Sequence, residues 1–211
     1  MMKTNLLPLA KEGISYFLYS LAFFILFLLF DFDFLAFLTF FLTLFIVYSF
    51  RNPERELAVF EARSFLSPVD GMVESIEELE DDEYAYKINI LSSCSDVAVL
   101  RVPANASVSQ LLKYNGARTS KNSKLFTTLN ENAEISFVTL EENRFKIMHT
   151  LERSFAPLFI ELETKQKLLQ TTRYGLMLNG KTSIYLPQNF RVNITIGSEL
   201  KASESLMGYF S

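Results

Sequence analysis

A phenylalanine-rich apolar stretch near the N-terminus constrains this chain more than any other feature. Residues 14–50 hold 12 of the 21 phenylalanines, and their only charges are Asp31 and Asp33. One helix over these 37 residues would measure about 55 Å, nearly twice the ~30 Å hydrocarbon core of a bilayer, with both aspartates near its middle. Dividing the stretch at the aspartates gives runs 14–30 and 34–50, each about 25 Å long as a helix. We therefore expect a transmembrane helical hairpin whose acidic tip lies in water.

The charges beside the hairpin predict its orientation. Lys3 and Lys11 precede the first run, and Arg51 and Arg55 follow the second, where they would act as interface anchors. Because positive flanks stay in the cytoplasm, both ends of the hairpin and the rest of the chain are expected on the cytosolic side. A signal peptide is the competing interpretation, but no small-residue cleavage site ends the first run and a second run follows directly. A re-entrant or interfacial hairpin is the remaining alternative.

Composition excludes several classes of function. The chain has 20 Lys+Arg against 24 Asp+Glu, a net charge of -4, so it lacks the basic excess that nucleic-acid binding requires. Cys94 is the only cysteine and cannot form an intrachain disulfide. Together with His149, the only histidine, it cannot supply the four ligands of a structural zinc site. We expect no metal.

Residues 51–211 follow the tail and hairpin of residues 1–50, and we expect them to form one mostly β domain. Apolar or alternating runs separated by Gly, Asn, Asp and Pro are typical of short strands. These runs lie at 84–90, 97–102, 135–140, 158–162, 182–186 and 191–196. Only two short helices are expected, at 58–63 and 106–114.

Two segments of this domain have the composition of special backbone sites. The sequence S-P-V-D-G at 67–71 predicts a tight turn, because proline sets φ, Asp70 can bond its own backbone and Gly71 can adopt a positive φ. A plain hairpin turn would explain it equally. Gly175 and Gly180 would let the backbone bend sharply or approach another group closely.

Five segments occur in a recognisable order. They are F-R-N-P-E-R at 50–55, S-P-V-D-G at 67–71, D-V-A-V-L-R-V-P at 96–103, N-E-N at 130–132, and Gly175 to Gly180 followed by Y-L-P at 185–187. With the hairpin before them, they resemble the phosphatidylserine decarboxylase family in its short bacterial form. That family has F-R-D/N-P-E-R, S-P-x-D-G, D-V-H-x-x-R-x-P, N-E-R-N and a late glycine segment ending in Y-L-P. The resemblance spans nearly the whole chain.

The resemblance implies a fold, a location and a chemistry. The family is built on a sheet with paired, lipoyl-like hairpins, here 67–76 and 192–205, in a β-sandwich-like domain on the cytosolic side of the bacterial inner membrane. Its proenzyme cleaves itself at a Gly-Ser bond, and the serine becomes a pyruvoyl group. This ketone forms a Schiff base with phosphatidylserine and withdraws electrons as carbon dioxide leaves, giving phosphatidylethanolamine. A histidine and the motif aspartate, here Asp70, deprotonate the serine.

This sequence departs from the family at both groups that self-cleavage needs. The pattern G-S-R-V-D-V-Y-L-P has five residues between its glycine and tyrosine, whereas four separate Gly180 from Tyr185. The missing residue is most simply the serine, since Lys181 then matches the basic residue that follows the cleavage site. Ala98 stands at the histidine of the D-V-H motif, and Arg101 where long-form relatives have another histidine. We therefore expect a catalytically impaired relative, a pseudoenzyme with no cofactor.

Other functions stay open at this point. An active pyruvoyl-dependent decarboxylase could use Ser183 as a displaced precursor, although a shift of two residues moves the reacting atom by ~6 Å along a strand. His149 is either the base for such a reaction or an ordinary, partly buried histidine. Cys94 has no paired imidazole in the sequence, so we expect it to be a small, buried hydrophobic residue.

A binding role is the third alternative. The domain could recognise membrane phospholipid such as phosphatidylserine, with Arg101 and Arg173 as substrate-binding residues. It could also pair with an active paralogue or with a second copy of itself. The last alternative is a membrane-anchored β domain that resembles the family but has kept no biochemical role.

Overall fold

The computed structural model describes residues 8–55, 63–80 and 83–211. The chain divides into two compact units, Met1–Glu54 and Arg55–Ser211, and each is described by itself. Of the short helix expected at 58–63, all but Arg63 lies outside the described residues.

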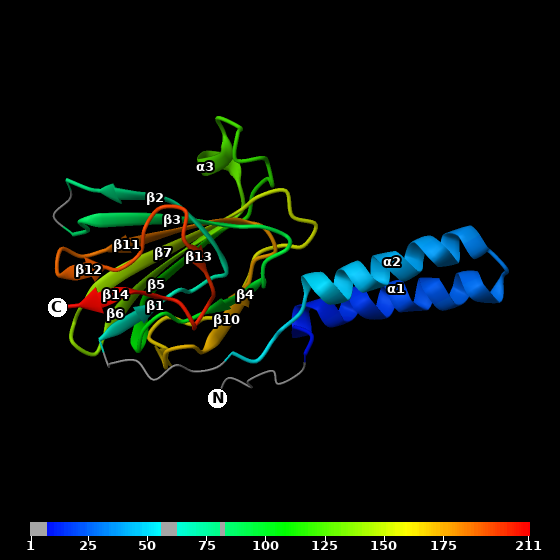
Figure 1. The fold of residues 1–211 in the computed structure, drawn as a ribbon, viewed down its shortest axis with the longest axis horizontal. Helices are drawn as coiled ribbons and strands as arrows, with labels where there is room; N and C mark the ends of the chain where they lie inside the picture. Colours follow the sequence, from blue (N-terminus) through cyan, green and yellow to red (C-terminus); the bar gives the residue numbers. More distant parts are fainter. Residues whose placement is uncertain (1–7, 56–62, 81–82) are drawn as a thin grey trace. The chain divides into compact units, whose positions relative to one another are not determined.

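The first unit is a pair of helices, α1 (Lys11–Leu29) and α2 (Asp33–Ser49), which run side by side in Figure 1. Asp31 occupies the turn between them with a positive φ of 55°, a conformation that aspartate tolerates. Asp33 is the first residue of α2, where its negative charge interacts favourably with the helix dipole. The predicted division at the aspartates is therefore confirmed. Helix α1 is long and apolar enough to cross a membrane, and α2 is a shorter apolar helix of 17 residues.

The two helices pack through small side chains. Ser20, Ala36 and Thr43 are buried, whereas Phe34 and Phe37 are largely exposed. Small residues let helix backbones approach closely, and this arrangement is common where the surroundings are apolar. The base of the pair is closed by backbone hydrogen bonds, including one from the Ala10 amide to the Phe50 carbonyl at 2.8 Å.

The second unit is built around antiparallel sheets (Figure 1). Its described strands are β1 (Ser64–Leu66), β2 (Gly71–Glu78), β3 (Tyr86–Ser92), β4 (Val99–Arg101), β5 (Ala106–Tyr114), β6 (Asn132–Thr139), β7 (Arg144–Leu151), β8 (Phe159–Ile160), β9 (Lys167–Leu168), β10 (Arg173–Leu176), β11 (Gly180–Leu186), β12 (Phe190–Val192), β13 (Glu199–Leu200) and β14 (Leu206–Phe210), with one short helix, α3 (Phe126–Leu129). They form an eight-stranded sheet, β13-β2-β3-β11-β7-β6-β5-β9, and two three-stranded sheets, β1-β14-β12 and β4-β10-β8.

An aromatic cluster joins the large sheet to the β1-β14-β12 sheet. The ring of Phe65 in β1 lies edge-on to Phe145, Phe190 and Phe210, with centroid distances of 5.1, 5.5 and 5.8 Å. Phe145 belongs to β7 of the large sheet and stacks on Phe137 of β6. The apolar faces of the two sheets therefore enclose the core, as in a β-sandwich. The mostly β fold behind two helices is confirmed.

One sequence-based assignment is wrong. Residues 106–114 were expected to be helical, but they form β5, which pairs with both β6 and β9. A register shift between Val108 and Gln110 interrupts the alternation that would have revealed the strand. The segment Q-L-L-K at 110–113 has high helix propensity, and sheet pairing overrides it.

The two segments expected to pair as hairpins do lie together. Strand β13 pairs with the start of β2, with Glu199 opposite Met72. The Ser67 amide donates to the Ser205 carbonyl at 2.9 Å, and the Val73 amide donates to the Ser198 carbonyl at 3.0 Å. This pairing fixes the turn that holds Asp70.

Candidate functional site

The S-P-V-D-G segment forms a tight turn into β2. The Ser67 hydroxyl donates to the Val69 carbonyl at 2.7 Å, which closes the turn. Gly71 has a φ of 153°, and a Cβ there would collide with the Leu91 carbonyl oxygen. Glycine is therefore required at this position. The turn therefore fixes the backbone that carries the Asp70 side chain.

Asp70 is held by two groups of its own unit. Its Oδ2 accepts a hydrogen bond from Arg55 Nη2 at 2.5 Å, and its Oδ1 accepts one from the Ala202 amide at 2.8 Å. The other arm of Arg55 lies 3.3 Å from Glu204 Oε1. The Arg55 side chain is only 9% exposed, so it is bound inside the domain. The expectation that Arg55 anchors the chain at a membrane interface does not agree with this position.

The segment containing Ala98 lies against the turn and against the link between β10 and β11. The Arg101 amide donates to the Pro68 carbonyl at 2.9 Å, and the Met177 amide donates to the Ala98 carbonyl at 2.8 Å. Ala98 is buried, and its methyl group offers no proton acceptor. The position that holds a histidine in the family pattern is therefore hydrogen-bonded to Met177, which precedes Gly180 by three residues in the chain.

Gly180 begins β11 and is linked to the Asp70 turn through Ser92. Gly180 pairs with Ser92 of β3, and the Ser92 hydroxyl donates to the Asp70 carbonyl at 2.6 Å. The structure thus brings together three separate predicted positions: Asp70, Ala98 and Gly180.

The pairing of β11 is continuous where the family pattern has one more residue. From Gly180 to Leu186 its register against β3 is unbroken, as is its register against β7 from Gly180 to Tyr185. Counting back from Tyr185 in the pattern G-S-R-V-D-V-Y-L-P puts Lys181 at the basic residue and Gly180 at the serine itself. A Cβ at position 180 would collide with the Thr150 carbonyl oxygen and lie 2.8 Å from the Met177 sulfur.

Lys181 and Ser183 are engaged in structural contacts. The Lys181 ammonium lies 3.0 Å from Glu74 Oε2, a partly exposed ion pair. The buried Ser183 hydroxyl donates to Asn89 Oδ1 at 2.6 Å. Asn89 in turn donates to Ser75 Oγ and Glu77 Oε1, both at 2.8 Å. Among the described residues, no imidazole is hydrogen-bonded to Ser183. The ring of His149 bonds instead to Thr182, the residue before Ser183, and to Tyr174.

His149 is completely buried, rather than partly buried as expected. Its Nδ1 lies 2.9 Å from Thr182 Oγ1 and its Nε2 lies 2.7 Å from the Tyr174 hydroxyl. Burial lowers the pKa of His149 to about 3 and raises the pKa of Tyr174. The imidazole is therefore neutral near pH 7, and both ring nitrogens have hydrogen-bond partners.

The remaining predicted residues lie near this region without joining it. Arg101 is 5% exposed and pairs across the β4-β10 ladder with Arg173, which is half-buried. Burial raises the pKa of the partly exposed Cys94 thiol, which opposes reactivity. The described residues contain no cluster of His, Cys, Asp and Glu suited to a metal ion.

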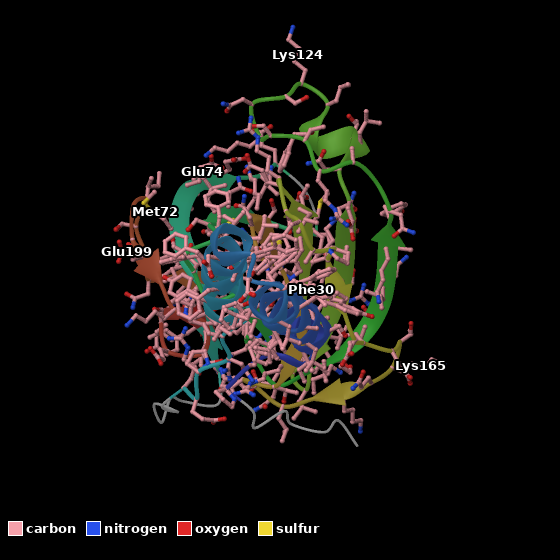
Figure 2. The ribbon with its side chains drawn as sticks, turned by 90° about the vertical axis from the view of Figure 1, so that its right-hand side faces the viewer. Phe30, Met72, Glu74, Lys124, Lys165 and Glu199 are labelled. Atoms are coloured by element: carbon pink, nitrogen blue, oxygen red, sulfur yellow. The ribbon has the colours of Figure 1, made fainter. Side chains whose placement is uncertain are left out.

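An open pocket of about 550 Å³ lies beside Asp70. Its charged lining consists of Asp70, Asp96, Glu199 and Lys201, and its apolar lining includes Met72. Figure 2 shows Met72 and Glu199 at the same edge of the domain. The pocket thus offers carboxylates, an ammonium group and apolar side chains.

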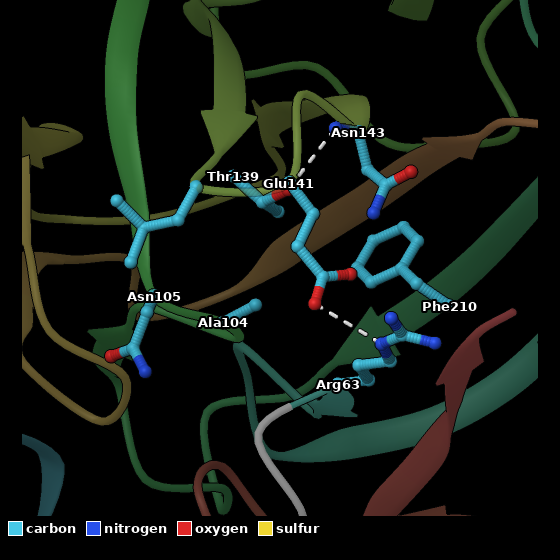
Figure 3. A pocket seen from close by; sticks show the side chains of 8 residues that line it. Arg63, Ala104, Asn105, Thr139, Glu141, Asn143 and Phe210 are labelled. Atoms are coloured by element: carbon cyan, nitrogen blue, oxygen red, sulfur yellow. Dashed lines mark hydrogen bonds and ion pairs between the residues drawn. The ribbon is translucent and has the colours of Figure 1, made fainter.

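A second hollow, of about 110 Å³, lies elsewhere (Figure 3). Its Arg63 is neutralised by Glu141, with Nε and Oε1 3.1 Å apart. No residue singled out from the sequence lines it, so the pocket beside Asp70 is the better candidate.

Sequence reasoning missed two features of the site. One is the Arg55–Asp70 ion pair, for which the only signal was the opposite charge of residues in two successive motifs. The other is the His149–Thr182 contact, which joins residues 33 positions apart and has no local signal.

Comparison with known proteins agrees with the motif order. The family model for phosphatidylserine decarboxylase matches residues 42–208. A phosphatidylserine decarboxylase proenzyme of Geobacter metallireducens is 30% identical over 172 residues, covering 79% of this chain and 78% of the relative. The proenzyme of Desulfotalea psychrophila is 24% identical over 206 residues, covering 95% and 96%, and that of Geotalea daltonii is 25% identical over 211 residues, covering 98% and 99%.

Proposed function

Because the chain belongs to the phosphatidylserine decarboxylase family, we propose that it is a membrane-attached member that neither processes itself nor decarboxylates phosphatidylserine. Helix α1 is compatible with membrane anchoring. In this proposal α1 and α2 hold the β domain at the cytosolic face of the bacterial inner membrane, where it binds phospholipid headgroups.

The observation that carries the loss of activity is Gly180. A pyruvoyl group derives from a serine side chain, and position 180 has neither the hydroxyl nor room for a Cβ beside the Thr150 carbonyl oxygen. The residues present therefore do not fit this group.

The groups that would activate a serine are also changed. Ala98 supplies no imidazole, and both oxygens of Asp70 already accept hydrogen bonds, from Arg55 and Ala202. A carboxylate held in this way supports the turn; it has no imidazole to orient and no nucleophile to activate. This supports a structural role for Asp70.

The pocket beside Asp70 supports headgroup binding. Phosphatidylserine carries an ammonium, a carboxylate and a phosphate. Glu199 and Asp96 suit the ammonium, whereas Lys201 suits either anion. In this proposal these three residues replace Arg101 and Arg173 as the headgroup contacts, because Arg101 is buried and neither arginine lines the pocket.

Intact mass and a decarboxylation assay test the loss of activity. The full-length chain, purified in detergent, should give one species at 24.2 kDa and release no carbon dioxide from phosphatidylserine. Two fragments divided near residue 180, with a keto group at the start of the smaller one, would contradict the proposal.

Titration with glycerophosphoserine tests the binding role. Wild type should bind it, Lys201→Ala should weaken binding about tenfold, and the exposed Lys167→Ala, on β9, should bind as wild type does. Equal affinity in the Lys201 and Lys167 variants would argue against this pocket.

A further inference from the structure

The segment between β5 and β6 projects from the β domain. This segment, residues 115–131, is called the α3 loop because it contains α3. Figure 1 shows α3 standing clear of the sheets, and Figure 2 shows Lys124 at the far end of the loop, pointing away from the domain. The loop is therefore placed to meet another surface.

The α3 loop differs in charge from the rest of the chain. The loop contains Arg118, Lys121 and Lys124 and a single acidic residue, Glu131 at its end, although the whole chain has a net charge of -4. Arg118 pairs with Glu131 at 3.1 Å at the base of the loop. Lys121 lies 3.7 Å from Glu74, and both side chains are partly exposed, so the pair is weak. Lys124 forms no ion pair with a described residue.

Two leucines are exposed at the two ends of α3: Leu125 directly precedes the helix, and Leu129 is its last residue. Leu125 is 52% and Leu129 is 51% exposed, and residues four apart lie on one side of a helical turn. Single exposed leucines are ordinary in soluble domains. A pair of leucines with adjacent lysines at the end of a projection instead has the composition of an interfacial membrane contact.

The base of the α3 loop is held by hydrogen bonds. The exposure of Leu125 and Leu129 is therefore not explained by a disordered loop. Asn130 is buried; its Oδ1 accepts from the Thr119 amide and hydroxyl, and its Nδ2 donates to the Thr119 and Leu151 carbonyls. The Ala117 amide donates to the Leu129 carbonyl at 2.7 Å. The leucines are thus presented by a fixed scaffold.

We infer that the α3 loop contacts the surface of an anionic phospholipid membrane, with Leu125 and Leu129 entering the headgroup region and Lys121 and Lys124 facing lipid phosphates. The inference rests on the membrane attachment proposed above. Charge complementarity favours this occupant, because lysines gain from an anionic surface and leucines gain from apolar burial. The contact would hold the β domain against the membrane in one orientation.

The absence of tryptophan from the chain permits a direct test. Full-length Leu125→Trp is incorporated into nanodiscs of phosphatidylcholine and phosphatidylglycerol, and its fluorescence is compared with and without brominated lipid. Leu140→Trp, at an exposed leucine in the β6–β7 turn, is the matched control. Phe23→Trp, in α1, reports on membrane attachment independently.

The inference predicts roughly twofold quenching at position 125, none at position 140, and weaker quenching at 125 when Lys121→Glu and Lys124→Glu are added. Quenching at position 23 without quenching at 125 would overturn the inference while leaving the attachment intact. Absence of quenching at position 23 would overturn both. Protection of position 125 from aqueous iodide without quenching by brominated lipid would point to a protein partner instead, and would also overturn the inference.

Discussion

Arg55 Nη2 lies 2.5 Å from Asp70 Oδ2, and both side chains are nearly buried, at 9% and 11% exposure. Each residue comes from a separate motif, F-R-N-P-E-R and S-P-V-D-G. Arg55 of the first motif therefore neutralises the carboxylate of Asp70 in the second. This contact links the start of the β domain to the turn beside the pocket.

Removing Arg55 should destabilise the domain strongly. Arg55→Ala leaves the Asp70 carboxylate and Glu204 without their cation, so we expect a loss of about 3–5 kcal/mol in the free energy of unfolding. The measurement is denaturant unfolding of the full-length chain in detergent, followed by circular dichroism.

The exposed pair between Arg63 and Glu141 provides the control for this substitution. Its side chains are 57% and 50% exposed, so Arg63→Ala should cost only about 0–1 kcal/mol. Similar losses for Arg55→Ala and Arg63→Ala would show that the Asp70 contact contributes no more than a surface ion pair.

Restoring a serine at position 180 should fail to restore self-cleavage. Gly180→Ser places a Cβ against the Thr150 carbonyl oxygen, and we expect a loss of about 1–3 kcal/mol from this overpacking. Gly180→Ala introduces the same Cβ without a hydroxyl and should cost a similar amount. Mass spectrometry should find both variants uncleaved. Cleavage of Gly180→Ser alone would mean that the backbone at β11 can adapt and that only the hydroxyl is missing.

Much of the architecture was predictable because its signals are local. The hairpin follows from uninterrupted apolar runs divided by Asp31 and Asp33, and most strand predictions overlap observed strands. The assignment of 106–114 failed because the bulge between Val108 and Gln110 and the sheet pairing of β5 are tertiary features.

The site was predictable only in part, for a similar reason. Asp70, Ala98 and Gly180 were found by motif order, and the structure brings them together through Ser92 and Met177. The partners of Asp70 and His149 were not found, because those contacts depend on how strands distant in sequence come to lie together.

Ser183 offers a test of the displaced-precursor alternative. Ser183→Ala removes the donor to the buried Asn89 Oδ1, so we expect a loss of about 1–3 kcal/mol and no change in the cleavage state of the chain. Ser183→Thr retains a hydroxyl and should be closer to wild type in stability. A wild-type chain cleaved before residue 183, and left whole by Ser183→Ala, would establish the active alternative.

The buried imidazole predicts a pH dependence of stability. Burial lowers the pKa of His149 to about 3 in the folded protein, against 6.5 for the ordinary side chain. Between these values the unfolded chain binds a proton that the folded chain does not. The contribution of neutral His149 to the free energy of unfolding is therefore fully present above pH 6.5. It is lost as the pH falls toward 3, by up to ~1.4 kcal/mol per pH unit.

His149→Gln isolates this effect. Glutamine does not titrate and can still hydrogen-bond Thr182 or Tyr174, so the variant should be less stable at pH 7.5 but lose stability less steeply between pH 6.5 and pH 4. The acidic residues titrate in both proteins, so the difference between the two unfolding curves reports on His149. Parallel curves over this range would show that His149 gains a proton in the folded state, contrary to its burial between Thr182 and Tyr174.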